Sequence, residues 1–162
     1  MNRVVLAPGE ALFVPAGLLH SHLRGTGIEV MANSDNVIRG GLTDKHVAVD
    51  ELVRIVDFSP HHPRVLRARA VAPGVRHYPT DIPEFAVWGL DPRPGTSVPL
   101  PGDGTPRIAL VTEGHATFTD ADGAVDLGRG RAVFVAANNS PVSVQGDGQV
   151  YVSSPGAWSD AT

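Results

Sequence analysis

The segment from Gly9 to Arg24 contains His20, a residue type that can bind a metal ion, at a fixed distance from glycine and proline residues. It reads Gly-x5-Pro-x-Gly-x2-His-x3-Arg. Glycine and proline favour tight turns, so we expect Gly9 to open a strand and the segment 15–17 to form a corner. The strand after the corner would bring one imidazole inward, where a neutral ring nitrogen can bind a metal ion. The alternative is a histidine that serves only packing.

Two neighbours could join His20 at a metal ion. His22 falls on the same face of the expected strand, because side chains alternate along a strand, and Glu29 follows a few residues later. Two histidines and one carboxylate are the ligands of non-haem iron oxygenases. A site made by His20, His22 and Glu29 is therefore a second interpretation of this segment.

Two stretches resemble known families. The Gly9–Arg24 spacing resembles the second signature of the cupin superfamily, with Arg24 where asparagine is usual. Residues 29–46 read Glu-Val-Met-Ala-Asn-Ser-Asp-Asn-Val-Ile-Arg-Gly-Gly-Leu-Thr-Asp-Lys-His. This run is similar to the signature of type I mannose-6-phosphate isomerases, also called phosphomannose isomerases. The likeness is close over residues 5–58, and the remainder resembles the C-terminal β-domain of that family.

The resemblance implies an aldose-ketose isomerase that interconverts mannose 6-phosphate and fructose 6-phosphate with one Zn²⁺ per complete site. His20 falls on a zinc-ligand histidine of the family. Arg39 falls on an arginine beside the substrate, where its planar fork suits an enediolate or a phosphate. Lys45 falls on a lysine that can make a second phosphate contact. The sugar phosphate is the partner that these residues imply.

The resemblance also implies that this chain holds an incomplete site. The other family ligands, a Gln and a His in a Gln-Pro-His segment and a Glu, have no match here, since the glutamines are Gln145 and Gln149. Zinc needs three or four protein ligands. We therefore expect the chain to be inactive alone, and to self-associate or to pair with a missing upstream half. A non-catalytic domain that binds carbohydrate or another chain is the alternative function.

The apolar pattern predicts an all-β, cupin or jelly-roll-like fold with one helix. Val49, Leu52, Val53 and Val56 recur at helical spacing. Residues 6–33 align without gaps on 127–154, with matches that include paired glycines, which indicates two copies of one β-roll half. The expected strands are 12–14, 20–23, 28–31, 85–90, 107–112, 116–119, 132–135, 142–144 and 150–153, with a turn at 113–115.

These elements suggest four segments. We expect the C-terminal half of a catalytic cupin in residues 1–42 and a connecting helix with its linker in 43–63. A jelly-roll-like domain would follow in 64–156, and a tail in 157–162. The preceding strands of the first copy are missing from this chain, whereas those of the second would lie in roughly 65–125.

Composition narrows the class of protein. The 162 residues are 42% hydrophobic, and 18 Gly and 14 Pro suit short strands joined by tight turns. With no Cys there is no disulfide or thiolate metal site. A net charge of −4 with scattered histidines gives no basic face for nucleic acid. No apolar stretch is long enough to span a membrane, so we expect a cytoplasmic protein.

Overall fold

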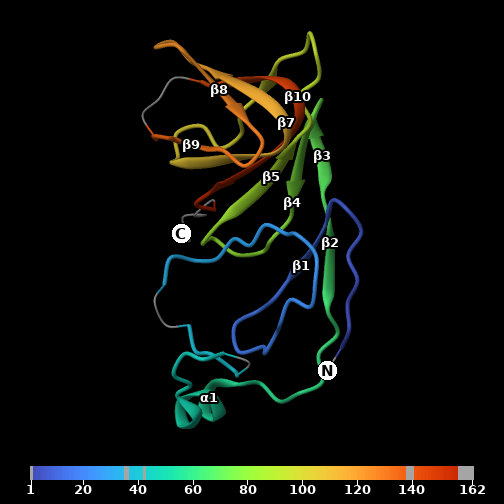
Figure 1. The fold of residues 1–162 in the computed structure, drawn as a ribbon, viewed down its shortest axis with the longest axis vertical. Coiled ribbons are helices and arrows are strands. Elements are labelled where there is room, and N and C mark those ends of the chain that lie inside the picture. Colours follow the sequence, from blue (N-terminus) through green and yellow to red (C-terminus); the bar gives the residue numbers. More distant parts are fainter. Residues whose placement is uncertain (1, 35–36, 42, 138–140, 157–162) are drawn as a thin grey trace, which may run out of the picture. The chain divides into compact units, whose positions relative to one another are not determined.

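The structure, a computed structural model, describes residues 2–34, 37–41, 43–137 and 141–156 (Figure 1). The expected tail, 157–162, therefore lies outside the described residues. The chain divides into two compact units, Met1–Leu66 and Arg67–Thr162. We call them unit 1 and unit 2. The all-β architecture with one short helix confirms the predicted fold class, whereas the finer segment boundaries remain predictions.

Unit 1 has little regular structure. Strand β1 (Glu10–Phe13) pairs with β2 (Arg64–Arg67) in a two-stranded sheet. Leu66 is the buried hydrophobic residue of this unit among those described, at 6% exposure. The other large apolar side chains of the unit are half-buried or exposed, so unit 1 lacks a closed core within the described part of the chain.

The predicted helix is confirmed as α1 (Val49–Ile55). Asp50 and Glu51 lie in its first turn and Arg54 in its last, where each charge complements the helix dipole. Leu52 is half-buried, whereas Val53 is 58% exposed, so the apolar stripe of the helix is only partly covered. Seven residues long, α1 falls well short of a membrane span, and the described part of the chain contains no other helix.

Unit 2 contains the hydrophobic core. Its eight-stranded sheet has the order β3-β4-β5-β10-β7-β8, with β6 paired to β10 and β9 paired to β7. Neighbours whose register is described run antiparallel. The core gathers alternate residues of these strands, including Leu90, Val111, Val144 and Val150, each fully buried. The strands are β3 (Arg69–Ala72), β4 (Val75–Tyr78), β5 (Ala86–Leu90), β6 (Val98–Pro99), β7 (Arg107–Thr119), β8 (Ala124–Gly128), β9 (Ala132–Val135) and β10 (Ser143–Ser154).

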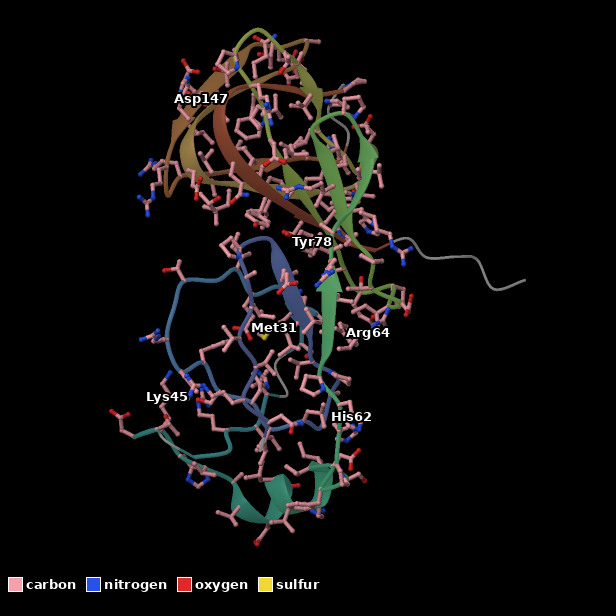
Figure 2. All side chains as sticks on the ribbon, turned by 90° about the vertical axis from the view of Figure 1, so that its right-hand side faces the viewer. Met31, Lys45, His62, Arg64, Tyr78 and Asp147 are labelled. Atoms are coloured by element: carbon pink, nitrogen blue, oxygen red, sulfur yellow. The ribbon has the colours of Figure 1, made fainter. Side chains whose placement is uncertain are left out.

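The turn predicted at residues 113–115 is wrong, because β7 runs through it without interruption. Here β7 and β10 approach so closely that only glycine fits. A Cβ built on Gly114 would overlap the carbonyl oxygen of Asp147, and one on Gly148 would overlap that of Glu113. The glycine that resembled a turn residue instead allows two long paired strands to approach closely, with Gly114 opposite Gly148. Asp147, on β10 in unit 2, is labelled in Figure 2.

The two-copy pattern has a structural counterpart in the turns that precede β1 and β9. Gly9 and its aligned residue Gly130 have φ angles of 83° and 79°. The same hydrogen bond closes both turns, from Glu10 N to Ala7 O at 3.0 Å and from Arg131 N to Gly128 O at 3.1 Å.

The strands expected at 20–23 and 28–31 are absent from unit 1. Their counterpart in the second copy is the single strand β10, which pairs with β7 along one edge and with β5 and β6 along the other. The first copy has no such neighbours among the described residues. Without them an apolar alternation cannot form a ladder, because strand hydrogen bonds are made between strands.

Candidate functional site

His20 follows a corner that is held from the end of the helix. Gly17 has a φ of +84°, and its carbonyl accepts a 3.0 Å hydrogen bond from Asp57 N–H, just beyond α1. A Cβ on Gly17 would lie 3.1 Å from the carbonyl oxygen of Ile55. Glycine is thus required twice, by its backbone angle and by this approach. The position of His20 therefore depends on the segment that leaves α1.

The ring of His20 is oriented by its own backbone. Its Nδ1 lies 3.2 Å from the carbonyl oxygen of Leu18. A carbonyl only accepts hydrogen bonds, so Nδ1 carries the hydrogen and Nε2 of the neutral ring keeps a lone pair. Such a contact from the second nitrogen commonly orients metal-binding histidines.

The free nitrogen of His20 faces a carboxylate. Nε2 lies 3.8 Å from Oε1 of Glu29, and the ring of His22 is edge-on with its centroid 6.0 Å from that of His20. The side chains of His20 and Glu29 are 49% and 56% exposed. Both groups are therefore open to solvent on the side where they face each other.

These residues do not complete a metal site. No group of three or more His, Cys, Asp or Glu side chains within the described ranges is placed to hold a metal ion. The two-His-one-carboxylate arrangement is therefore not formed, since His22 does not join the His20–Glu29 pair in such a group. A catalytic zinc needs about three protein ligands, and the described residues do not provide them together.

Arg39 and Lys45 are exposed and carry unpaired charges. Within the described part of the chain, neither the Arg39 guanidinium nor the Lys45 ammonium makes a hydrogen bond or an ion pair. The backbone N–H of Lys45 donates to Thr43 Oγ1 at 3.2 Å, which shapes the turn before it. Figure 2 shows the position of Lys45 in unit 1. Asp35, Asn36 and Leu42 of the same run lie outside the described residues.

A packing contact links the segments that carry His20 and Arg39. A Cβ built on Gly40 would lie 2.6 Å from Cδ2 of Leu19, so the residues adjacent to the two functional side chains touch. Sequence reasoning missed this contact and the bond from Asp57 to Gly17. Only Gly17 carried a signal, because the Pro-x-Gly corner marks a glycine-dependent turn. No hydrogen bond or ion pair joins His20, Arg39 and Lys45 to one another within the described residues.

Comparison with known proteins supplies the family. No family model matches the chain. Mannose-6-phosphate isomerase of Escherichia coli is 36% identical over 151 residues, which are 93% of this chain and 38% of that protein. Mannose-6-phosphate isomerase 2 of Arabidopsis thaliana is 36% identical over 137 residues, 85% of this chain and 31% of the relative. The chain is homologous to a C-terminal portion of mannose-6-phosphate isomerases.

A solved structure agrees with the sequence relatives. The mannose 6-phosphate isomerase of Salmonella typhimurium, crystallised with fructose 6-phosphate and zinc, matches with a TM-score of 0.65 and 27% identity. The match covers 78% of this chain and 32% of that one. The chain thus spans well under half the length of the mannose-6-phosphate isomerases that it resembles. The resemblance stated from residues 29–46 is confirmed at the level of homology.

Proposed function

We propose that this chain provides part of the active site of a cytoplasmic isomerase that interconverts mannose 6-phosphate and fructose 6-phosphate. The observation that carries the proposal is the run of residues 29–46, which holds Arg39 and Lys45 and begins at Glu29, the carboxylate that faces His20. The Salmonella relative was crystallised with fructose 6-phosphate and zinc. This supports a sugar phosphate as the ligand and Zn²⁺ as the cofactor.

The reaction requires a proton to move between C1 and C2 of the sugar through an enediolate. Arg39 would bind planar oxyanion groups of the substrate, because its guanidinium offers parallel N–H donors. Lys45 would contact the phosphate as a point charge. Neither Arg39 nor Lys45 forms an ion pair within the described residues, so both charges are available to an anionic substrate.

His20 would supply one zinc ligand through Nε2, the nitrogen left free by the contact with Leu18. The remaining ligands would come from residues other than those described, because no three-ligand group is present among the latter. We therefore expect the chain to be inactive alone. It would act by self-association or together with the rest of the isomerase.

A second candidate follows from the same observation. A domain that binds carbohydrate or a protein without catalysis needs no complete metal site. The lack of a three-ligand group among the described residues is consistent with such a domain. The two functions differ in what they require of Arg39 and Lys45, since only sugar-phosphate chemistry depends on both cations.

Binding of a sugar phosphate distinguishes the two functions, because only the isomerase requires both Arg39 and Lys45. Phosphorus NMR of mannose 6-phosphate titrated with the chain should show binding that Arg39→Ala and Lys45→Ala each weaken about tenfold, the equivalent of about 1.4 kcal/mol. Arg54→Ala is the matched control, because Arg54 is an exposed arginine of the same unit that already pairs with Glu51. Equal effects of all three substitutions, or no binding at all, would count against the proposed function.

A further inference from the structure

The side chain of Asp57 closes a turn where the chain leaves α1. Its Oδ1 accepts a 2.8 Å hydrogen bond from the backbone N–H of Ser59. Its Oδ2 lies 2.8 Å from Nε2 of His61, which donates because a carboxylate only accepts. The carbonyl of His61 in turn accepts a 2.6 Å hydrogen bond from the side-chain amide of Asn2. One carboxylate therefore fixes the path of residues 57–61, and Asn2 holds the far end of this turn.

The helix does not fix the direction of the backbone at Asp57. At the end of α1 the N–H of Val56 donates to Leu52 O at 3.0 Å, and Val56 is already extended, with a ψ of 130°. The N–H of Asp57 donates instead to the carbonyl of Gly17 at 3.0 Å. Because this N–H and the carboxylate belong to one residue, the turn that orders the carboxylate also sets the direction of the N–H.

The corner at Gly17 passes this restraint to the ring of His20. A Cβ built on Gly17 would lie 3.1 Å from the carbonyl oxygen of Ile55 and 3.9 Å from Cβ of Asp57, so the corner fits closely against this segment. The carbonyl of Gly17 shares a planar peptide unit with the N–H of Leu18. The next carbonyl, that of Leu18, lies 3.2 Å from Nδ1 of His20. A movement of Asp57 therefore reaches the ring through consecutive peptide units.

The carboxylate of Asp57 suits this task at neutral pH. The N–H and hydroxyl of Ser59, followed by His61, lower the pKa of Asp57 from 3.8 to about 2, so both oxygens remain acceptors. The side chains of His61 and Asp57 are 41% and 45% exposed, and exposed ion pairs contribute little to overall stability. The main effect of Asp57 is therefore expected in the local geometry of the corner.

We propose that Asp57 is a positioning residue for His20. Its carboxylate holds the turn that directs its own N–H to Gly17, and the corner at Gly17 holds His20 in the tautomer with the hydrogen on Nδ1. The lone pair then stays on Nε2, the nitrogen that lies 3.8 Å from Oε1 of Glu29. The inference rests on the proposed function in one respect, that Nε2 of His20 is a zinc ligand. The contacts from Asp57 to the ring lie within unit 1 and do not depend on that role.

Long-range proton–nitrogen NMR of the full chain measures the tautomer directly, at about pH 8, where a histidine of ordinary pKa is neutral. The chain contains seven histidines, so the signals lost in His20→Gln assign those of His20. Asp57→Ala removes both acceptors of the turn. The ratio of the Nδ1–H to the Nε2–H tautomer of His20 should then fall about fivefold, the equivalent of about 1 kcal/mol and of one hydrogen bond.

Further variants separate the turn from other effects. Asp57→Asn keeps one oxygen acceptor and should retain most of the ratio. Gly17→Ala disturbs the corner itself and should lower the ratio as Asp57→Ala does. Gly25→Ala is its matched control, because Gly25 also has a positive φ, 115°, but a Cβ there would meet nothing within 4 Å. Glu51→Ala, which removes an exposed carboxylate of α1, should leave the ratio unchanged.

A ratio that is unchanged in Asp57→Ala would overturn the inference. An equal loss in Asp57→Ala and Asp57→Asn, or in Gly17→Ala and Gly25→Ala, would overturn it too, since the effect would then not pass through the turn and the corner. Amide signals of α1 in the same samples report that unit 1 remains folded.

Zinc binding separates this inference from the proposed function. In a complete isomerase that contains this chain, Asp57→Ala should weaken zinc binding at least about tenfold, as loss of a group that orients a metal ligand does. Asp57→Asn should restore most of it, and competition with a chelator measures both. A changed tautomer with unchanged zinc binding would support the positioning of His20 and contradict its proposed role as a zinc ligand.

Discussion

Replacing Gly114 by alanine should destabilise unit 2 far more than an ordinary glycine substitution does. Gly114 has a φ of +62°, a conformation that costs a residue with a Cβ about 1–2 kcal/mol. The added Cβ would also overlap the carbonyl oxygen of Asp147 on β10, which is backbone and cannot rotate away. Overpacking of this kind adds about 1–3 kcal/mol. The expected loss in the free energy of unfolding is therefore about 2–5 kcal/mol.

Gly104 provides the matched control for this substitution. Its φ of +77° is similar, but a Cβ there would meet nothing within 4 Å. Gly104→Ala should thus lose only the conformational part, about 1–2 kcal/mol. Urea unfolding followed by circular dichroism gives both values. Equal losses for Gly104→Ala and Gly114→Ala would refute the close approach of the paired strands β7 and β10.

Three further predictions concern the site, the linker and the core. In an active, completed isomerase, Arg39→Lys should lower turnover at least about tenfold and leave the melting temperature unchanged. The reason is that the point charge of lysine cannot replace the bidentate contact of a guanidinium with an oxyanion. Unchanged turnover would show that Arg39 is not part of the site. The N–H and hydroxyl of Ser59, followed by His61, lower the pKa of Asp57 from 3.8 to about 2. Asp57 therefore stabilises the fold above about pH 4 and loses this effect as the pH falls toward 2, so its carboxyl resonance in carbon NMR should titrate near 2 and not near 3.8. Leu90→Ala should lower the free energy of unfolding, measured with urea, by about 2–5 kcal/mol. The control Ile108→Ala, at an exposed position, should lower it by less than about 0.5 kcal/mol. Similar losses for the two substitutions would contradict the burial of Leu90.

Sequence patterns predicted the helix and part of the strands, but not β2, β3, β4 and β6, although the partners of these strands lie within the chain. The helix followed from the spacing of Val49 to Val56, and β1, β5 and β9 from short apolar runs between turn residues. Strand β8 (Ala124–Gly128) was not predicted, because it is short and largely exposed, and only Val125 and Leu127 of it are large and apolar. Strand β7 was divided in two because Gly114 has the residue type of a turn but lies inside a closely spaced antiparallel strand pair.

The candidate site was only partly predictable for a related reason. The position of His20 follows from a local motif, and the structure adds its orientation through Leu18. The bond from Asp57 to Gly17 and the contact of Leu19 with Gly40 join residues distant in sequence, and no local pattern encodes them. The strands expected at 20–23 and 28–31 were wrong for this structure because strand pairing depends on partners that the described chain does not contain.

The most direct test of the account is fructose 6-phosphate formation from mannose 6-phosphate with added zinc. The chain alone should be inactive. Refolded with the remaining segment of the E. coli isomerase, it should turn over within the ordinary enzyme range of about 1–1000 per second, and His20→Ala should abolish that activity. Turnover by the chain alone, or activity of the mixture that survives His20→Ala, would contradict the claim that this chain supplies one zinc ligand to a site completed elsewhere.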